Sequence, residues 1–358
     1  MTAMASLVDW DLAARTAQRL GAVGTDDPTV SPREADHAVS ELYRSAAVAA
    51  DHVAAITRLS EPPVTAPTRV VDRAAWVEAN AAGMSAVMDP LVERLTESHR
   101  PGRLAQTVGS RVTGTQVGAV LAFLSGKVLG QFEFFAESGG QLMLVAPNVV
   151  AVERGLGVLP VDFRLWVCLH EVTHRVQFTA VPWMKDHMRR EVDALGESLD
   201  TDGAELRQRI GDAVGALSEA VRGRRQPDDA GAGLLGLLAT PAQREVLDRV
   251  TAFMSLVEGH AEWVMNAVDR SVIPTQAAIE ARFATRRSKG GNPLDRIVRK
   301  LLGLDAKTRQ YVDGAAFVRS VVDRVGVDRF NTVWTSPETL PVKAEIAEPE
   351  AWVRRVLG

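Results

Sequence analysis

Two histidines and a glutamate near the middle of the chain, His170, Glu171 and His174, form the pattern HExxH. Residues four apart lie on one face of a helix, so the two imidazoles can reach one metal ion. Glu171 is one position further round the helix, where its carboxylate can take a proton from a water on that metal. Zinc lowers the pKa of such a water to about 7. The pattern therefore predicts a metal-dependent hydrolase in which His170 and His174 bind the metal and Glu171 is the general base.

The residues around this pattern indicate a helix that is otherwise apolar. Pro160 and Asp162 form a helix start, with Asp162 as the expected N-cap, and Pro182 lies about two turns beyond the second histidine. Buried polar groups cost free energy unless they are paired, so the three polar side chains need a partner. HExxH occurs by chance in roughly one chain in a hundred of this size. A hydrogen-bonded pair of core histidines is therefore the alternative to a metal site.

A catalytic zinc needs a third protein ligand and an open fourth position. Where metzincins have a glycine and a third histidine, this chain has Gln177 and Ala180, which excludes that class. A later segment carries Glu258 and Glu262 four residues apart, and it resembles the second helix of gluzincin metallopeptidases. The resemblance implies that Glu258 is the third ligand and that Glu262 holds a ligand histidine by its other ring nitrogen. Gluzincins usually have Asp in the latter role, so a swap of the two glutamates, or His260 as the ligand, is left open.

Two further features match parts of such sites. Tyr311 is one of two tyrosines, and gluzincins commonly use a tyrosine to hydrogen-bond the reaction's oxyanion; a simply packed tyrosine is the alternative. Residues 142–146 lie between glycines and Pro147 and are expected to form a strand. In zincins a strand upstream of the metal helix often borders the cleft, and an extended peptide can add to its edge. A structural hairpin is the alternative for this strand.

Composition and charge limit the possible partners. The 358 residues are 46% hydrophobic and 24% charged, with a formal net charge of −4, as in ordinary soluble globular proteins. This balance gives no electrostatic reason to bind nucleic acid or an anionic membrane. Residues 1–20 lack a long apolar core, so no signal peptide is expected there, and no stretch is apolar enough to span a bilayer. A cytoplasmic protein, or one exported by another route, is therefore expected. The single cysteine, Cys168, excludes an internal disulfide and is expected to be a small core residue.

Helical patterns dominate the rest of the chain. They cover residues 35–59, 74–95, 104–135, 183–199, 204–222, 239–269, 294–302 and 307–325, with loops expected at 222–231 and 286–293. The sequence therefore predicts a mainly α protein, with a zincin-like core and a small sheet or hairpin. An N-terminal helical region, residues 1–103, is expected to precede a metal-binding region, residues 104–358, although the two can share one core.

Several segments match one family when they are taken together. They are residues 128–132, 144–148, 162–167, 170–178, 182–183, 254–265 and 330–334, with Lys307, Gln310 and Tyr311. In these segments the chain resembles an actinobacterial family of zincin-like hydrolases. The resemblance extends from about residue 8 to the end of the chain. One branch of that family is named for an association with the biosynthesis of a deazaflavin coenzyme. The resemblance implies a mainly helical, metal-dependent hydrolase and implies little about the substrate.

The leading hypothesis is a zinc metallopeptidase of gluzincin type that acts on a peptide or a small amide, with zinc as its cofactor. One alternative is a degenerate or metal-stabilised zincin that serves as a binding or assembly protein. Another is an amidohydrolase that acts on a small metabolite. The intact set of chemical residues argues against degeneracy, but no specificity pocket can be identified from the residues. The substrate and the oligomeric state are therefore left open.

Overall fold

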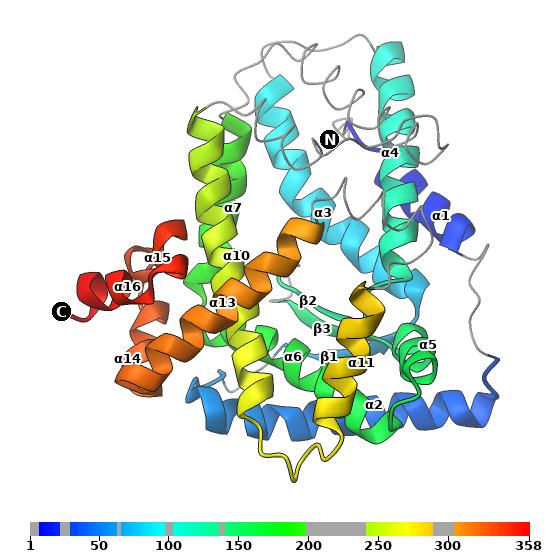
Figure 1. Ribbon diagram of the computed structural model, residues 1–358. Coiled ribbons are helices and arrows are strands. Elements are labelled where there is room, and N and C mark those ends of the chain that lie inside the picture. The colour runs from blue at the N-terminus through cyan, green and yellow to red at the C-terminus, as the bar shows by residue number, and fades with distance from the viewer. Residues whose placement is uncertain are drawn as a thin grey trace. The chain divides into compact units, whose positions relative to one another are not determined.

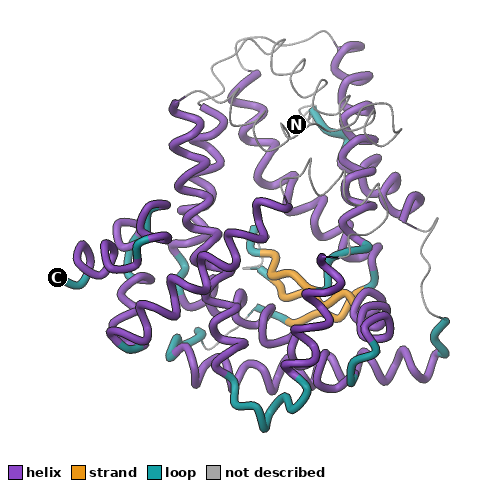
Figure 2. The backbone as a smooth tube through the Cα atoms, in the orientation of Figure 1, coloured by secondary structure: helices purple, strands orange, loops and turns teal. Residues whose placement is uncertain are grey.

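Helices and a three-stranded sheet make up the part of the chain that the computed structural model describes (Figures 1 and 2). The described residues are 7–21, 29–62, 66–96, 103–135, 140–197, 241–288 and 304–358. The prediction of a mainly α protein with a small sheet is confirmed. The predicted helices 204–222 and 294–302, the loop 222–231 and most of the loop 286–293 lie outside the described residues.

The chain divides into two compact units. The first comprises Met1–Ala180 and Val268–Glu280, and the second comprises Val181–Ala267 and Ala281–Gly358. The expected regions 1–103 and 104–358 stay a prediction.

The helices of the first unit are α1 (Trp10–Gly21), α2 (Pro32–Thr57), α3 (Arg73–Thr96), α4 (Arg103–Ser125), α5 (Ala146–Leu156) and α6 (Pro160–Ala180). Ser31 caps α2 in a capping box with Glu34, because each side chain bonds the other residue's backbone N–H. Pro147, which the sequence suggested as a turn residue, instead lies in the first turn of α5. Proline suits that position because the first N–H groups of a helix have no partner within it.

The sheet consists of β1 (Thr68–Val71), β2 (Gly130–Glu133) and β3 (Gln141–Val145), in the order β1-β3-β2. β3 pairs in parallel with β1 and antiparallel with β2, with Gly130 opposite Leu144. The expectation that residues 142–146 offer an exposed edge is therefore wrong, because β3 is paired on both sides. The helix expected over 104–135 is also wrong at its end, since α4 stops at Ser125 and β2 follows.

The two faces of the sheet pack against different helices. On one face, Gly130 and Phe132 face α6, which also packs against α2 (Figure 1). On the other face, the side chain of Gln131 accepts a hydrogen bond from Trp76 Nε1 in α3, at 2.9 Å. Successive side chains of a strand point to opposite faces, so β2 contacts both helices. This places the edge strand β2 directly beside the HExxH helix.

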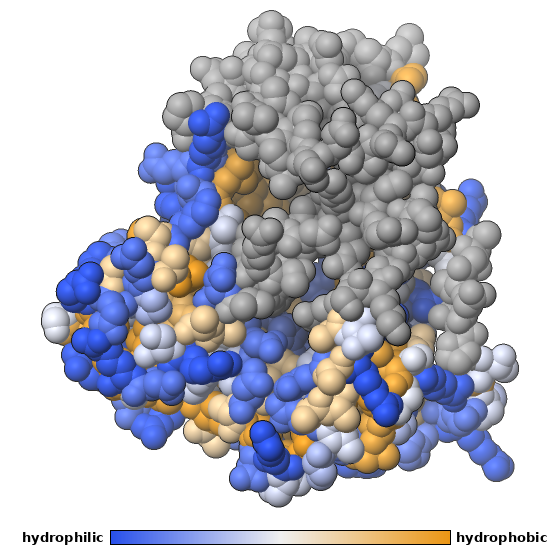
Figure 3. All heavy atoms as spheres, viewed as in Figure 1, coloured by the Kyte–Doolittle hydropathy of each residue, from blue (hydrophilic) through white to orange (hydrophobic). Residues whose placement is uncertain are grey.

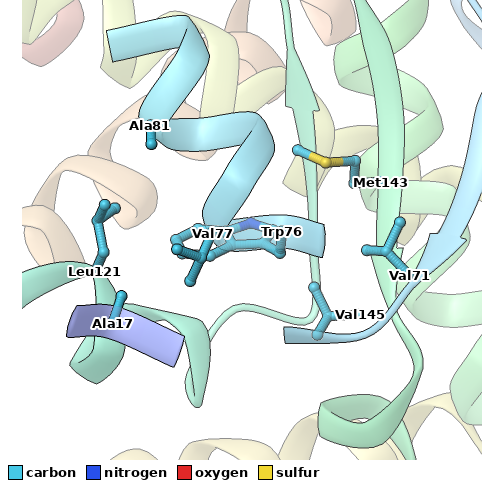
Figure 4. Close-up of a cluster of buried hydrophobic side chains, with 8 residues drawn as sticks. All are labelled: Ala17, Val71, Trp76, Val77, Ala81, Leu121, Met143 and Val145. Carbon is cyan, nitrogen blue, oxygen red and sulfur yellow. The ribbon is translucent and has the colours of Figure 1, made fainter. Parts of the chain in front are cut away.

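The core on the α3 side of the sheet is a cluster of buried apolar side chains (Figure 4). Trp76, Val77 and Ala81 of α3 belong to this cluster together with Met143 and Val145 of the central strand. The cluster is completed by Val71, Ala17 and Leu121. Met143 and Val145 are two residues apart, so they lie on the same face of β3. Leu142 and Leu144 lie on the opposite face, towards α6, and are buried as well. A strand with both faces buried reads as a continuous apolar run, which explains its sequence.

The second unit is built around α10 (Pro241–Ala267), which packs against α7 (Trp183–Glu197) and α13 (Leu304–Val325). α11 (Gln276–Ser288) begins in the first unit and ends in the second. Residues 286–288, which were predicted to begin the loop 286–293, are therefore helical. The tail consists of α14 (Val327–Phe330), η1 (Asn331–Trp334), η2 (Pro337–Thr339), α15 (Lys343–Ala347) and α16 (Pro349–Val356). Trp352 is fully buried and donates its Nε1 hydrogen to the carbonyl of Thr339, at 2.8 Å. The tail is therefore an integral part of this unit.

No helix in the described part of the chain is both long enough and apolar enough to cross a membrane. The face shown in Figure 3 mixes hydrophilic and hydrophobic side chains. Exposed large apolar residues occur on several different helices, such as Leu20, Val112 and Leu247.

Candidate metal centre

α6 carries the HExxH pattern and is buried over most of its surface. Phe163, Leu169 and Val176 are completely buried, and most of the other residues of the helix are buried as well. His170 and His174 are only half-buried. The two imidazoles therefore lie on the least covered side of the helix. This differs from a pair of fully buried core histidines, which was the alternative to a metal site.

The start of α6 differs from the expected one. The helix begins at Pro160, so Asp162 lies in its first turn and is not the N-cap. Its Oδ2 atom accepts hydrogen bonds from Thr275, at 3.0 Å from the backbone nitrogen and 2.6 Å from Oγ1. A carboxylate near a helix N-terminus also interacts favourably with the helix dipole. Asp162 thus connects the start of α6 to the segment that follows Ile273.

The two histidines direct the same ring nitrogen at a common point. Nε2 of His170 and Nε2 of His174 are 3.2 Å apart, and the rings stand almost perpendicular, at 85°. Two zinc–nitrogen bonds of about 2.05 Å at a tetrahedral angle would separate these nitrogens by about 3.3 Å. The spacing therefore suits one metal ion held by both rings.

Gln177 lies one turn beyond His174 and is completely buried. Its Oε1 atom is 2.9 Å from Nδ1 of His174. A carbonyl oxygen can only accept, so Nδ1 of His174 carries the hydrogen and Nε2 of a neutral ring keeps its lone pair for a metal. The sequence suggested Glu262 for such a role and noted Gln177 only as the residue that stands where metzincins have a glycine. The i, i+3 spacing from His174 was the signal that could have identified it.

Glu171 is 8% exposed and lies against Gly130 of β2. A methyl group built on Gly130 would lie 2.6 Å from Cγ of Glu171 and 3.1 Å from its Oε1. Any other residue at this position would therefore displace the glutamate side chain. The pattern HExxH identified Glu171, whereas the need for a glycine opposite it depends on strand pairing and could not be seen.

Cys168 is fully buried, and its Sγ is 3.7 Å from the carbonyl oxygen of Leu42. Burial, and secondarily the charge of Glu171, raises the pKa of its thiol far above the usual value. A thiol that stays protonated is a poor metal ligand. This agrees with the expectation of a small core residue.

Glu258 lies on α10. One group of three potential metal-ligating side chains is found among the described residues: His170, His174 and Glu258. One nitrogen from each imidazole and one oxygen of the carboxylate lie within 4.8 Å of one another. Two imidazoles and one carboxylate form a donor set that suits zinc and leaves room for a further ligand. These residues thus fit the metal that the HExxH pattern implies.

The other residues considered as ligands or supports have different surroundings. His260 is 1% exposed, and its ring packs against the rings of Trp263, Phe330 and Trp334. Oε1 of Glu262 lies 3.4 Å from the side-chain amide of Asn266, one turn further along α10. The role expected for Glu262 beside a ligand histidine and the alternative of His260 as a ligand stay predictions.

Tyr311 lies in α13. The placement of its side chain is outside the described part of the structure. Its role as an oxyanion donor therefore also stays a prediction.

Comparison with known proteins assigns the class. The chain belongs to the zincin-like metallopeptidase family, whose model matches residues 8–353. It is also similar to a "putative hydrolase with a novel fold" from Chloroflexus aurantiacus, known from a crystal structure. That protein shares 32% sequence identity over 97% of this chain and 98% of its own, with a TM-score of 0.69. No curated protein matches the chain. The expected zincin-like family is confirmed, whereas these comparisons show neither the actinobacterial family nor an association with a deazaflavin coenzyme.

Proposed function

We propose that this protein is a zinc-dependent hydrolase that cleaves peptide bonds. The observation that supports it most directly is the convergence of ligand atoms from His170, His174 and Glu258 within 4.8 Å. Membership of the zincin-like metallopeptidase family supports the same reaction class.

Each residue has a separate part in the proposed reaction. His170, His174 and Glu258 hold the zinc, which when bound would supply Lewis acidity to a water and to the scissile carbonyl. The carboxylate of Glu171 takes a proton from the attacking water and then passes it to the leaving amine. Gln177 keeps His174 in the tautomer that leaves Nε2 free. The low exposure of Glu171, 8%, limits competing water around its carboxylate.

The position of β2 favours a peptide over a small metabolite. β2 is at an edge of the described sheet, and its Gly130 lies against Glu171. An extended peptide can add to such an edge through main-chain hydrogen bonds. A chain bound there would run past the general base. The role first expected for residues 142–146 is therefore proposed for Gly130–Glu133.

Metal analysis tests the proposal first. Elemental analysis of the purified protein should find about one zinc per chain, and the Glu258→Gln variant should lose most of it. Glu262→Gln is the matched control, because it makes the same change one turn further along the same helix. Zinc that is lost only in the control would transfer the ligand role to Glu262. A protein that takes up no zinc even when it is supplied would contradict the proposal.

The general base is tested separately. Glu171→Gln should retain zinc and lower the cleavage of a peptide library by about 10²–10⁴-fold. Full activity in this variant would contradict the mechanism. Zinc binding without cleavage of any peptide by the unmodified protein would favour a binding or assembly role.

A further inference from the structure

α10 and α13 touch through their backbones at a pair of glycines. A methyl group built on Gly259 would overlap the carbonyl carbon of Gly314 and lie 2.5 Å from the nitrogen of Ala315. A methyl group built on Gly314 would overlap the carbonyl oxygen of Ser255 and lie 3.2 Å from Cα of Gly259. A side chain on Gly259 would therefore need the space of the Gly314 backbone, and a side chain on Gly314 would need the space of the Ser255 carbonyl group.

The atoms in contact decide how the helices could respond to a larger residue. They belong to the backbone in every case named above, so no rotamer change can make room. Interaxial distances depend on the side chains at the crossing, and a methyl group at either position would force the two helices apart. Glycine destabilises the interior of a helix relative to alanine. Two glycines at one crossing therefore indicate a requirement for close approach.

The crossing is adjacent to a proposed metal ligand. Glu258 directly precedes Gly259, and consecutive Cα atoms are about 3.8 Å apart at a fixed distance. Glu258 therefore moves with Gly259 whenever α10 shifts at the crossing. Metal–ligand distances are expected to lie within about 0.2 Å of their usual values. A shift on the scale of a methyl group is larger than that range.

α13 is itself held in place by the tail of the chain. Phe317, one turn beyond Gly314, packs edge-on against Trp352 of α16, with ring centroids 5.8 Å apart. Arg324, near the end of α13, forms an ion pair with Glu350. Because α13 is braced on this side, it offers a rigid surface for Gly259.

We propose that Gly259 and Gly314 are positioning residues, which set the place of Glu258 through the backbone contact between α10 and α13. The inference rests on the proposed function, because it requires Glu258 to be a metal ligand. It extends that function by making α13 and the C-terminal helices the structural support of the third ligand.

The test compares metal binding with fold stability in matched variants. Gly259→Ala and Gly314→Ala place one methyl group at the crossing. Val321→Ala is the control, because Val321 is a fully buried residue of α13 about two turns beyond Gly314. It removes packing from the same helix without touching the crossing. Zinc affinity is measured by competition with a chelator, thermal unfolding is measured without metal, and the absorption spectrum of the Co²⁺-loaded protein reports ligand geometry.

Both glycine variants should bind zinc about 10–100-fold more weakly, as when other groups that orient a ligand are lost. Their Co²⁺ spectra should change, whereas Val321→Ala should keep the affinity and spectrum of the unmodified protein even if it unfolds at a lower temperature. Equal affinities and spectra in the glycine and control variants would overturn the inference. If neither glycine variant folds, Ala315→Val adds methyl groups beside the crossing and should weaken zinc binding in the same sense. An unchanged affinity in that variant would likewise overturn it.

The proposed function can fail independently. It fails if the unmodified protein binds no zinc or if Glu258→Gln binds zinc normally. When those two results support it and only the glycine variants behave like the control, the positioning role alone is wrong.

Discussion

His174 and Gln177 are joined by a hydrogen bond of 2.9 Å between Nδ1 and Oε1, formed by a side chain that is completely buried. Both residues lie on α6, so the contact comes from the i, i+3 geometry of one helix. It fixes the ring orientation of His174 before any metal arrives. Partners of this kind are often as necessary as the ligands themselves.

Replacing Gln177 by leucine should therefore weaken zinc binding by about 10–100-fold, because the ring loses its acceptor. Gln177→Glu is the matched control, since it retains an oxygen acceptor of the same reach and should keep most of the affinity. A chelator competition assay measures both variants. Equal affinity in the leucine variant and the unmodified protein would show that Gln177 does not orient His174.

Gly130→Ala should lower turnover without removing zinc. The added methyl group would lie 2.6 Å from Cγ and 2.8 Å from Cδ of Glu171, so the carboxylate must move. A displacement of about 1 Å can lower a rate by about 100-fold. Gly109→Ala is the control, because a methyl group there meets no atom within 4 Å. Peptide cleavage and zinc content are measured on both, and unchanged cleavage in Gly130→Ala would contradict the proposed role of Glu171.

The sequence identified the candidate site residues of α6 more directly than the elements that surround them. HExxH encodes the positions of His170, Glu171 and His174 within a single helix, so spacing alone was sufficient. The start of α2 is also set locally, because its capping box joins Ser31 to Glu34 three residues later. Local patterns of this kind can be read without knowledge of the fold.

Features that depend on distant pairing were missed. β3 looks like an exposed strand from its turn signals, but β1 pairs with it across about seventy residues of sequence and leaves β2 at the edge. β2 itself was taken as the end of a helix, because four residues carry little periodicity. The glycines opposite Glu171 and beside Glu258 have meaning only after the neighbouring elements are placed.

Breaking the buried ion pair between Arg164 and Glu153 on one side only should strongly destabilise the first unit. Nε and Nη2 of the arginine donate to the two carboxylate oxygens at 3.0 and 2.6 Å, and the side chains are 7% and 3% exposed. Glu153→Gln leaves a buried guanidinium without its counter-charge, which should cost about 3–5 kcal/mol of unfolding free energy. Urea unfolding measures this loss.

An exposed pair provides the comparison for that prediction. Lys343 and Asp248 approach to 2.7 Å with side chains 61% and 54% exposed, so Asp248→Asn should cost less than about 1 kcal/mol. Replacing both Arg164 and Glu153 by methionine should restore much of the stability lost in the single variant, because no unpaired charge is left. A single variant that loses no more than Asp248→Asn would contradict the prediction.

His187 should make the second unit less stable in mild acid. Its ring packs against Trp183 and Phe253, and burial lowers its pKa below the usual 6.5; the charges of Arg190 and Arg249 act in the same direction and that of Glu191 against it. Between the lowered pKa and 6.5 the unfolded chain binds a proton that the folded chain does not. The unfolding free energy therefore falls as the pH drops below 6.5 in the unmodified protein.

His187→Phe keeps an aromatic ring in this place and removes the titrating group. Urea unfolding of both proteins on either side of pH 6.5 should show a smaller loss of stability in the phenylalanine variant on the acid side. Well above that pH, the unfolding free energies of the two proteins should depend on pH in the same way, because His187 is neutral in both the folded and the unfolded chain. An equal acid-induced loss in the two proteins would show that the proton is taken up elsewhere.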